Sequence, residues 1–372
     1  MTDRDPAADS TTDVPHSADG ASYAAAGVDI DAGERAVELF APHAKRASRP
    51  EVMGSLGGFS GLFALKGNYR EPVLAAASDG VGTKLAIAQA IGKHDTVGRD
   101  LVAMCVDDLV VCGAEPLFLQ DYIAIGKVVP ETVAQIVAGI ADGCVEAGCA
   151  LLGGETAEHP GLMGEDHYDL SATAVGVVEA DQVLSPEKVR PGDVVIAMGS
   201  SGLHSNGYSL ARKVLLEWGH MDLNGYVEEF GRTLGEELLE PTRIYARDCL
   251  ALAAETEVRT FAHVTGGGLV ENLARVVPAG LVAELERETW TPAPVFAMIA
   301  HRGRVAREEM ERTFNMGVGM VAVVAPEDTE RAQAVLTARH VDNWVIGAIK
   351  RSAEPKNAEA PRAVLAGEHP RF

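Results

Sequence analysis

The sequence predicts a mixed α/β protein of two domains, and three observations support this fold class. Apolar, strand-like runs alternate with helical patterns along most of the chain, and several of these runs end in glycine-rich loops. The pattern is interrupted by a turn, RPGD at 190–193, and then restarts. The length of 372 residues favours two or three compact units. We therefore expect an N-terminal domain over residues 21–180 and a C-terminal domain over 181–351, each with a mixed sheet packed with helices.

Hydrophobic spacing predicts the elements of the N-terminal half. In DLVAMCVDDLVVCG, residues 100–113, Leu101, Cys105 and Leu109 recur every four positions, which predicts an amphipathic helix with a wide apolar stripe. A second helix should begin at Pro130, because a proline in the first turn loses no hydrogen bond there. The other expected elements are strands at 72–78, 118–125, 150–154 and 170–178 and a helix at 85–91.

The C-terminal half repeats the strand, glycine-loop and helix scheme. Strands are predicted at 194–199, 261–264, 317–324 and 344–350, and helices at 208–217 and from the TGGG loop to about Val277. The first 20 residues are rich in aspartate with little to bury, which predicts a disordered tail. Residues 352–372 are polar and without periodicity, and we expect a mobile tail there.

Composition excludes several classes of protein. The formal net charge is −22, which disfavours binding to nucleic acid and to anionic membrane surfaces. No stretch approaches the roughly 20 apolar residues of a membrane span, and the N-terminus lacks the features of a signal peptide. The five cysteines are an odd number and form no CxxC pair, which favours free thiols. We therefore expect a cytoplasmic protein with no nucleic-acid or membrane partner.

The segment SDGVGTK, Ser78–Lys84, has the features of a magnesium–nucleotide phosphate site. Gly80 and Gly82 leave room for backbone N–H groups to approach an anion at the start of a helix. Lys84 adds a positive charge, and the Asp79 carboxylate is the kind of oxygen ligand that Mg²⁺ prefers. The segment is not a Walker A motif. Taken alone, the segment could equally be a structural turn without a phosphate site, since most glycine loops are plain turns.

Two neighbouring carboxylates favour the metal interpretation. Asp107 and Asp108 lie on the predicted helix at 100–113, and Asp100 shares a face with Asp107. Carboxylates this close repel one another unless a cation lies among them. The alternative is a solvated acidic face, although the neighbours of this pair are mostly apolar. A third carboxylate, Glu155, follows Gly153 and Gly154 at a strand end in LLGGETAEHPG, where the alternative is an ordinary turn with a capping glutamate.

Two loops of the C-terminal half concentrate polar groups at strand ends. GSSGLHSNGYS contains His204 and Asn206, and HVTGGGLVEN contains His263, so both loops suit a phosphate or a general acid or base. The alternative for each histidine is a surface or satisfied core residue. Arg312, in RTFNMGVGM, is a possible phosphate ligand, with a plain edge strand and bulge as the alternative.

Taken together, these motifs resemble the phosphoribosylformylglycinamidine cyclo-ligase (AIR synthetase) family of purine biosynthesis. The resemblance runs in order from about Tyr23 to Lys350 and covers nearly the whole folded chain. It rests on the motifs AGVDIDAG, GGFSGLF, SDGVGTK, DLVAMCVDDLVVCGAEPLF, GGETAEHPG, GSSGLHSNGYSLAR, PTRIYA, HVTGGGLVEN and RTFNMGVGM. Single motifs occur in a wider superfamily of ATP-dependent enzymes, whereas the ordered set is specific to the cyclo-ligases.

The resemblance implies a reaction, its cofactors and its site. ATP would activate the formyl oxygen of formylglycinamidine ribonucleotide, and the amidine nitrogen would close the imidazole ring with release of ADP and phosphate. Asp79, Asp108 and Glu155 would hold Mg²⁺. The nucleotide would lie against Gly57, Gly58, Phe59, Gly80, Gly82, Thr83, Lys84, Gly153 and Gly154. The ribotide would lie against Ser205, Asn206, Gly207, His263, Thr265, Gly266, Gly267, Gly268 and Arg312. Asp79, Lys84 and His204 would be catalytic, with His204 moving a proton.

The resemblance also implies a homodimer joined through the N-terminal domains, and it contains two departures. His159 stands where methionine is common in the family, so we assign it no catalytic role. Asp107 stands where asparagine is often found, which leaves Asp108 as the firmer metal ligand.

The competing families fit less well. A selenophosphate synthetase needs a reactive cysteine near its N-terminus, but the first cysteine here is Cys105, and the hydrogenase-maturation relative ends in a cysteine that this chain lacks. The glutamine-dependent formylglycinamidine synthetase is far longer. Thiamine-phosphate kinase is closest in size but lacks the HSNGYS and HVTGGG motifs. A non-catalytic nucleotide sensor would be expected to have lost a carboxylate or lysine of the site, and none is missing.

Overall fold

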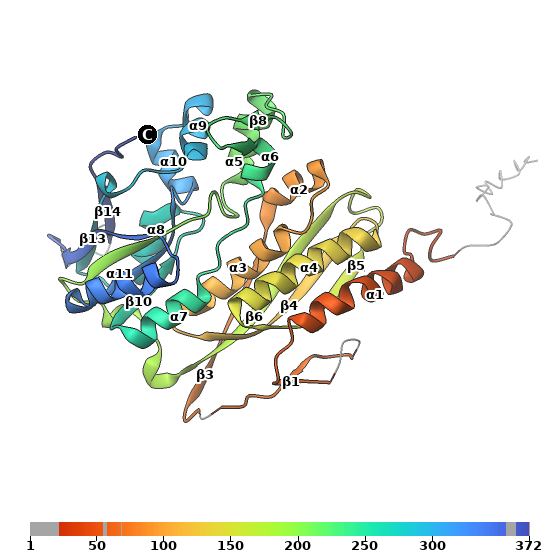
Figure 1. The fold of residues 1–372 in the computed structure, drawn as a ribbon, viewed down its shortest axis with the longest axis horizontal. Coiled ribbons are helices and arrows are strands. Elements are labelled where there is room, and N and C mark those ends of the chain that lie inside the picture. The colour runs from red at the N-terminus through yellow and green to blue at the C-terminus, as the bar shows by residue number, and fades with distance from the viewer. Residues whose placement is uncertain (1–21, 55–57, 68, 355–361, 372) are drawn as a thin grey trace, which may run out of the picture.

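Two sheets, one in each half of the chain, organise the fold (Figure 1). The structure is a computed structural model, and it describes residues 22–54, 58–67, 69–354 and 362–371. The tail predicted over residues 1–20 lies outside the described residues. The strands of the first sheet all precede residue 180, and those of the second sheet all follow residue 193.

The N-terminal sheet has four strands in the order β3-β6-β4-β5. These are β3 (Pro72–Gly80), β6 (Tyr168–Glu179), β4 (Glu115–Ile125) and β5 (Ala150–Glu158). β6 runs antiparallel to both of its neighbours, whereas β4 and β5 are parallel. Along β6, residues 168–174 alternate between buried and exposed, because only one face of this sheet is packed on helices.

Helices cover that single face of the N-terminal sheet. They are α3 (Val97–Val110), α4 (Pro130–Ala147) and α1 (Ile30–Arg46), which packs on α4 (Figure 1). The 3₁₀ turn η1 (Gly82–Lys84) and α2 (Leu85–Ile91) follow β3 directly. A short hairpin, β1 (Val52–Met53) with β2 (Leu62–Phe63), projects from the domain.

The C-terminal sheet has six strands in the order β10-β12-β7-β13-β11-β14. Their bounds are β10 (Val258–His263), β12 (Val318–Val324), β7 (Val194–Gly199), β13 (Asn343–Arg351), β11 (Leu281–Glu286) and β14 (Ala363–Ala366). Only β11 and β14 pair in parallel. β12, which contains Gly319 of RTFNMGVGM, lies between two neighbours, so the edge-strand alternative for this segment is wrong.

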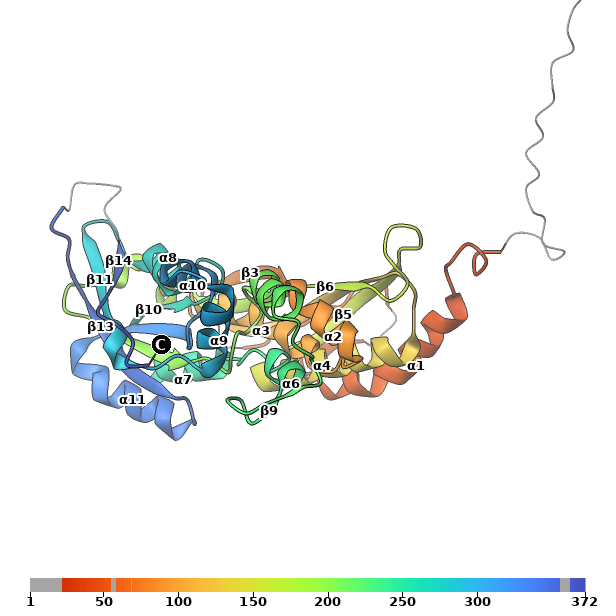
Figure 2. The same ribbon diagram turned by 90° about the horizontal axis from the view of Figure 1, so that it is seen from above.

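Helices of the C-terminal half pack around this sheet, and α11 lies at the end of the molecule opposite α1 (Figures 1 and 2). They are α5 (Tyr208–Arg212), continued by a π-helical turn (Lys213–Trp218), α6 (Leu234–Leu238), α7 (Ala246–Glu255), α8 (Gly268–Val276), α9 (Pro294–Gly303), α10 (Arg307–Thr313) and α11 (Thr329–Ala338). A hairpin of β8 (Tyr226–Val227) and β9 (Arg232–Thr233) precedes α6. Short 3₁₀ turns lie at Ala180–Gln182, Pro186–Lys188, Arg287–Thr289 and Pro326–Asp328.

Helix α3 is a core helix and not an amphipathic surface helix. All of its residues are buried except Arg99 and Asp108. One side packs on β3 and β6, a second on α4, and a third meets α7 of the C-terminal half. The spacing of apolar residues predicted one buried stripe, but α4 and the second domain cover further sides of the helix, which sequence periodicity cannot reveal.

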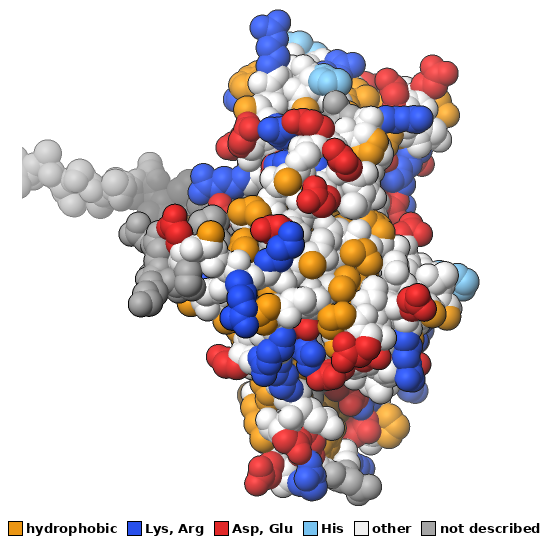
Figure 3. All heavy atoms as spheres, turned by 90° about the vertical axis from the view of Figure 1, so that its left-hand side faces the viewer, with side chains coloured by type: hydrophobic (Ala, Val, Ile, Leu, Met, Phe, Trp, Pro, Cys, Tyr) orange, Lys and Arg blue, Asp and Glu red, His pale blue; other side chains and the backbone are white. Residues whose placement is uncertain are grey.

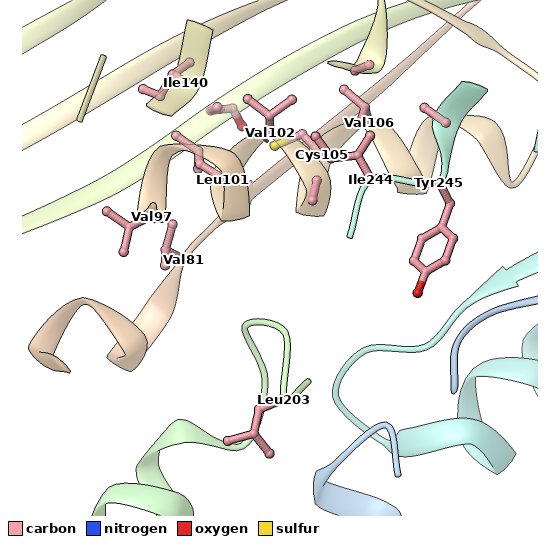
Figure 4. Close-up of a cluster of buried hydrophobic side chains, with 14 of the residues drawn as sticks. Val81, Val97, Leu101, Val102, Cys105, Val106, Ile140, Leu203, Ile244 and Tyr245 are labelled. Atoms are coloured by element: carbon pink, nitrogen blue, oxygen red, sulfur yellow. Dashed lines mark hydrogen bonds between the residues drawn. The ribbon is translucent and has the colours of Figure 1, made fainter. Parts of the chain in front are cut away.

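One hydrophobic core runs continuously from the first domain into the second. In Figure 4, Cys105 and Val106 of α3 lie near Ile244, while Leu203 projects from the loop before α5. These side chains belong to a single cluster of buried residues. A second cluster packs the other face of the C-terminal sheet. The continuous cluster fixes the two domains against each other.

The end of the chain is ordered where a mobile tail was expected. β14 pairs with β11, and the Arg287 guanidinium donates hydrogen bonds to the carbonyls of Leu365 and Gly367. The His369 ring packs edge-on against Trp290, with the ring centroids 4.6 Å apart. The prediction of a mobile tail is therefore wrong for residues 362–371, because the polar composition of this segment gave no sign of the strand pairing. Residues 355–361 lie outside the described part of the chain.

The surface carries charges of both signs. On the face shown in Figure 3, acidic and basic side chains are interspersed without a continuous basic area. Among the described residues, none of the helices has both the length and the apolar character needed to cross a bilayer.

Close packing of α3 on α4 depends on glycines and can be tested. A Cβ on Gly98 would lie 2.3 Å from the Ile140 nitrogen and 2.5 Å from the Ile136 oxygen. We expect Gly98→Ala to lower the free energy of unfolding by about 2 kcal/mol or more, because backbone atoms must move apart. Chemical denaturation measures this effect. The matched control, Gly33→Ala in α1, has nothing within 4 Å of the added Cβ and should be neutral or slightly stabilising. Equal effects of the two changes would contradict the packing argument.

Candidate functional site

A cavity of about 480 Å³ lies where the two domains meet. Asp79, Gly80 and Gly82 line it from the N-terminal domain, and Ser205, Asn206 and Thr265 line it from the C-terminal loops, together with Val81, Met104, Asp169, Leu170 and Ser171. The structure therefore brings the SDGVGTK segment together with the HSNG and TGGG loops, three motifs that are far apart in sequence.

The SDGVGTK segment takes its shape from the end of β3. A Cβ on Gly80 would lie 2.8 Å from the Leu170 oxygen, and Gly82 has a φ of 71°, so both positions require glycine. The Gly80 N–H donates to the Asp79 carboxylate at 2.7 Å. The Thr83 side chain of this segment contacts the other domain, where its hydroxyl oxygen lies 3.1 Å from that of Ser209.

Asp108 and His263 form a charged pair near Asp79, which lines the cavity. Asp108 is the exposed residue near the end of α3, and one of its carboxylate oxygens, Oδ1, lies 2.9 Å from His263 Nδ1. Burial raises the pKa of Asp79, and the negative charge of Asp108 raises it further, although the Gly80 N–H opposes both. Burial alone would lower the pKa of His263, but the hydrogen bond with Asp108 and the three nearby carboxylates outweigh it, so that pKa is raised.

Asp107 has a different partner from its neighbour. Its side chain is fully buried, and its carboxylate accepts a hydrogen bond of 2.9 Å from the Tyr245 N–H. Burial raises the pKa of Asp107 to about 7. The solvated acidic face considered for this pair is therefore wrong for Asp107, and the carboxylate holds the C-terminal domain instead of facing the cavity.

Lys84 does not point at the cavity, although the sequence predicted it among the groups that face the triphosphate. Its side chain is fully buried, and its ammonium donates to Asp100 at 2.8 Å. It also donates to the carbonyls of His204 at 3.1 Å and Glu240 at 2.7 Å. The correction has a physical reason, because η1 turns the residue inward against α3, a rotation that the motif alone does not define.

His204, the predicted proton carrier, is also enclosed. Its backbone has a φ of 61°, and its Nε2 accepts a hydrogen bond of 3.2 Å from the Ser201 N–H. The ring therefore carries its proton on Nδ1, which has no hydrogen-bond partner among the described residues. Burial lowers the pKa of His204 well below its usual value, and the nearby positive charges of His263, Lys84 and Arg243 add to this.

The two C-terminal loops place their glycines for close contacts. Gly207 has a φ of 77° and precedes α5, where a Cβ would lie 2.3 Å from the Phe314 ring. Gly267 has a φ of 94° and precedes α8, while a Cβ on Gly268 would lie 1.7 Å from the Glu311 oxygen. Gly266 lies beside the Asn206 side chain. These glycines support the loops whose polar residues line the cavity.

Arg312 lies apart from the interdomain cavity. Its guanidinium is exposed and forms an ion pair of 3.1 Å with Glu271 of α8. It lines neither this cavity nor a second one that lies under α1.

The second cavity, of about 550 Å³, lies under α1 at the β5 edge of the N-terminal sheet. Gly58, Phe59, Gly153, Gly154 and Glu155 line it, together with apolar residues of α1. Gly57, predicted to cover the nucleotide, lies outside the described residues. Phe59 is fully exposed and therefore has no packing partner that would explain an aromatic ring at this place.

Glu155 is separated from the other two predicted metal ligands. The register aligns Gly80 with Ser171, Ser171 with Tyr122, and Tyr122 with Glu155 across the whole sheet. Three strand spacings of about 4.8 Å put the two ends of this row about 14 Å apart. Within the described chain, no three His, Cys, Asp or Glu side chains are grouped as a metal site. One subunit therefore does not assemble the predicted set of Asp79, Asp108 and Glu155.

The structure adds one carboxyl group that the sequence did not single out. Asp121 lies on β4 and lines the cavity under α1, and burial raises its pKa to about 7. It faces Gly154, where a Cβ would lie 2.3 Å from the Asp121 carboxylate oxygen. A clue was present in the sequence, since a charged residue interrupts the apolar run FLQDYIAI.

Comparisons with known proteins cover both halves of the chain. The family model described as AIR synthase related protein, N-terminal domain, matches residues 67–178, and the corresponding C-terminal domain model matches residues 190–356. A protein of Anaeromyxobacter dehalogenans named phosphoribosylformylglycinamidine cyclo-ligase is 56% identical over 88% of this chain and 95% of its own length. A second cyclo-ligase, of Geobacillus kaustophilus, is 48% identical over 92% of this chain and 99% of its own.

Solved structures at lower identity show the same fold. The hydrogenase maturation protein HypE in complex with ATP superimposes with a TM-score of 0.61 at 20% identity, over 90% of each chain. At this identity, the likeness shows the fold alone.

The buried His204 predicts a defined dependence of stability on pH. Because its pKa is lowered in the folded protein, the unfolded chain binds an extra proton below pH about 6.5, so wild-type stability falls with falling pH. The slope for one proton approaches about 1.4 kcal/mol per pH unit. We expect His204→Asn, which tolerates a positive φ, to lose this component in denaturation measured at pH 5.5 and 7.5. The exposed His301→Asn is the control. An unchanged pH dependence in His204→Asn would refute the assignment.

Proposed function

Because the chain belongs to the phosphoribosylformylglycinamidine cyclo-ligase family, we propose that it closes the imidazole ring of 5-aminoimidazole ribonucleotide from formylglycinamidine ribonucleotide with ATP. One observation supports this function above the others. The interdomain cavity joins a glycine turn suited to phosphate, the Asp79 carboxylate and two polar C-terminal loops, and the Asp108–His263 pair lies near Asp79. A reaction between a nucleotide and a phosphorylated ribotide needs such groups on opposite sides of one space.

The reaction proceeds by activation and displacement. The formyl oxygen takes the γ-phosphoryl group of ATP and ADP leaves. The amidine nitrogen then attacks the activated carbon, and phosphate departs with the former formyl oxygen as the ring closes. The nitrogen loses one proton to a base in the site. Positioning of the two substrates and neutralisation of phosphoryl charge supply most of the catalysis in reactions of this kind.

We assign the divalent cation to Asp79 and Asp108. The pKa of Asp79 is raised by burial and by the charge of Asp108, which describes two carboxylates that a cation between them would relieve. His263 occupies Oδ1 of Asp108, so Oδ2 remains for a metal. Mg²⁺ supplies neutralisation of phosphate charge when it is bound. Glu155 of the same subunit is too far to join this pair, and we assign it to the nucleotide side of the cavity under α1.

We assign the proton transfer to His263 in preference to His204. The Asp108 carboxylate orients the His263 ring through Nδ1 and stabilises its protonated form, while Nε2 has no hydrogen-bond partner among the described residues. A histidine held by a carboxylate is a suitable general base near neutral pH. The His204 ring, whose Nε2 is bonded to the Ser201 N–H, instead shapes the loop that carries Asn206.

We assign the remaining substrate contacts to the two sides of the interdomain cavity. Gly80 and Gly82, which have no side chains in the way, face the phosphates, and Ser205, Asn206 and Thr265 face the ribotide. The exposed Phe59 and the strand end at Gly153 and Gly154 line the cavity under α1, which suits the apolar part of the nucleotide. All five cysteines are free, in accord with a cytoplasmic location.

We also propose a homodimer formed through the N-terminal sheet. Its face opposite the helices is uncovered, with Leu74 on β3 and Tyr122 on β4 exposed by 62% and 42%. Ser78 and Thr173 share a hydrogen bond of 2.6 Å at the middle of this face. A sheet face without helices and with exposed apolar side chains is suited to packing against its own copy.

The activity can be tested directly. Purified protein with Mg-ATP and formylglycinamidine ribonucleotide should release ADP only when the ribotide is present, together with an aminoimidazole detectable by diazo coupling. Asp79→Asn should reduce turnover at least a hundredfold without changing the thermal unfolding midpoint by more than a few degrees, because it removes a ligand and not a packing group. The control Asp181→Asn changes an exposed carboxylate paired with Arg70 and should keep activity. Ribotide-independent ADP release, or an active Asp79→Asn enzyme, would sink the assignment.

The dimer is tested by light scattering after size exclusion. The 39.2 kDa chain should elute at twice its mass. Thr173→Arg puts a charge at the centre of the uncovered face and should give a folded monomer. Ala334→Arg, on the exposed side of α11 in the other domain, should remain dimeric. A wild-type monomer, or a dimer that survives Thr173→Arg, would contradict the proposed face.

A further inference from the structure

We propose that Lys84 is a positioning residue that holds the His204 loop of the C-terminal domain against the phosphate loop, and that it does not bind the nucleotide. It is the last residue of the SDGVGTK motif, so its backbone belongs to the N-terminal domain. Its ammonium, however, reaches the carbonyls of His204 and Glu240 in the C-terminal domain. One side chain thereby connects the two halves of the interdomain cavity.

The ammonium has a complete set of partners in this position. A lysine ammonium has three N–H donors, and Lys84 has three acceptors at 2.7–3.1 Å. The Tyr208 ring lies 5.5 Å away and closes the site. No donor remains for a phosphate oxygen, and exposing the ammonium would break a fully buried ion pair with Asp100.

Asp100 extends the connection to a second C-terminal segment. Its Oδ1 accepts hydrogen bonds from the Thr242 N–H at 2.7 Å and the Thr242 hydroxyl at 2.6 Å, besides the one from Lys84. The buried pair thus fixes residues 240–242 as well as His204. Both attachments cross the boundary between the domains.

The contact between Lys84 and the His204 carbonyl affects the interdomain cavity, because the residues that follow His204 in the chain line that cavity. Ser205 and Asn206 line the cavity directly, and Gly207 begins α5. His204 has a positive φ of 61°, a backbone conformation that a non-glycine residue adopts only when its surroundings hold it. Its carbonyl is held by Lys84 and its ring by the Ser201 N–H. Without Lys84, one of these two restraints is lost, and Asn206 is no longer fixed opposite Asp79.

The test separates a positioning role from a phosphate contact. In Lys84→Met/Asp100→Asn, no charge is left buried, and the asparagine oxygen can still accept from Thr242. We expect Mg-ADP to bind this variant within threefold of wild type by calorimetry. Amide exchange over residues 203–207 should rise at least tenfold, and kcat should fall at least tenfold. The control Lys93→Met removes an exposed lysine and should change none of these quantities.

The two measurements, Mg-ADP affinity and amide exchange, can each contradict the positioning role of Lys84. A tenfold loss of Mg-ADP affinity, or unchanged exchange at 203–207, would overturn the proposal. Thr242→Val removes only the hydroxyl bond to Asp100, so it provides a milder variant if the double variant does not fold, and it should raise the same exchange without weakening Mg-ADP binding. The kcat readout rests on the proposed cyclo-ligase function, whereas exchange and nucleotide binding do not, so a failure of that function leaves the positioning test intact.

Discussion

The packing of α3 between two domains is the constraint on which the site depends. Three aspartates on this helix have three different tasks, because each faces a different neighbour. Asp100 forms a buried pair with Lys84, and Asp107 accepts the Tyr245 N–H. Asp108 alone is exposed, and it meets His263 near Asp79. Burying two carboxylates is unfavourable unless each has a partner. Lys84 supplies one partner from the same domain, and Thr242 and Tyr245 of the second domain supply the others.

The amino-acid sequence predicts the local part of this architecture well. Leu85–Ile91 was expected as a helix and forms one with the same bounds, and Pro130 begins α4 as expected. Apolar spacing and proline chemistry act within a few residues, so they survive in the folded protein. Three of the glycine motifs, SDGVGTK, HSNG and TGGG, meet at the interdomain cavity as expected, whereas Gly153 and Gly154 line the other cavity. Family membership, carried by the order of those motifs, was the firmest result of all.

The features that the sequence did not predict depend on contacts between distant segments. The inward turn of Lys84, the enclosure of His204 and the docking of residues 362–371 each require a partner from another part of the chain. The separation of Glu155 from Asp79 has the same origin, because it results from the strand order β3-β6-β4-β5. The order of carboxylates along the sequence does not determine which edge of a sheet each one occupies. The metal set predicted from the resemblance therefore combined Asp79 at one edge with Glu155 at the other.

Successive residues of β3 point to opposite faces of the sheet. Asp79 points toward α3 and the cavity, while Ser78 lies on the uncovered face and contacts Thr173. This strand therefore directs Asp79 toward the chemistry, and it places Leu74 and Ser78 at the assigned subunit contact. Inserting or deleting one residue in the middle of β3 would exchange the two sets, whereas a change of two residues would preserve them. Variation in the length of this strand among relatives should accordingly occur in pairs of residues, or be absorbed by a bulge.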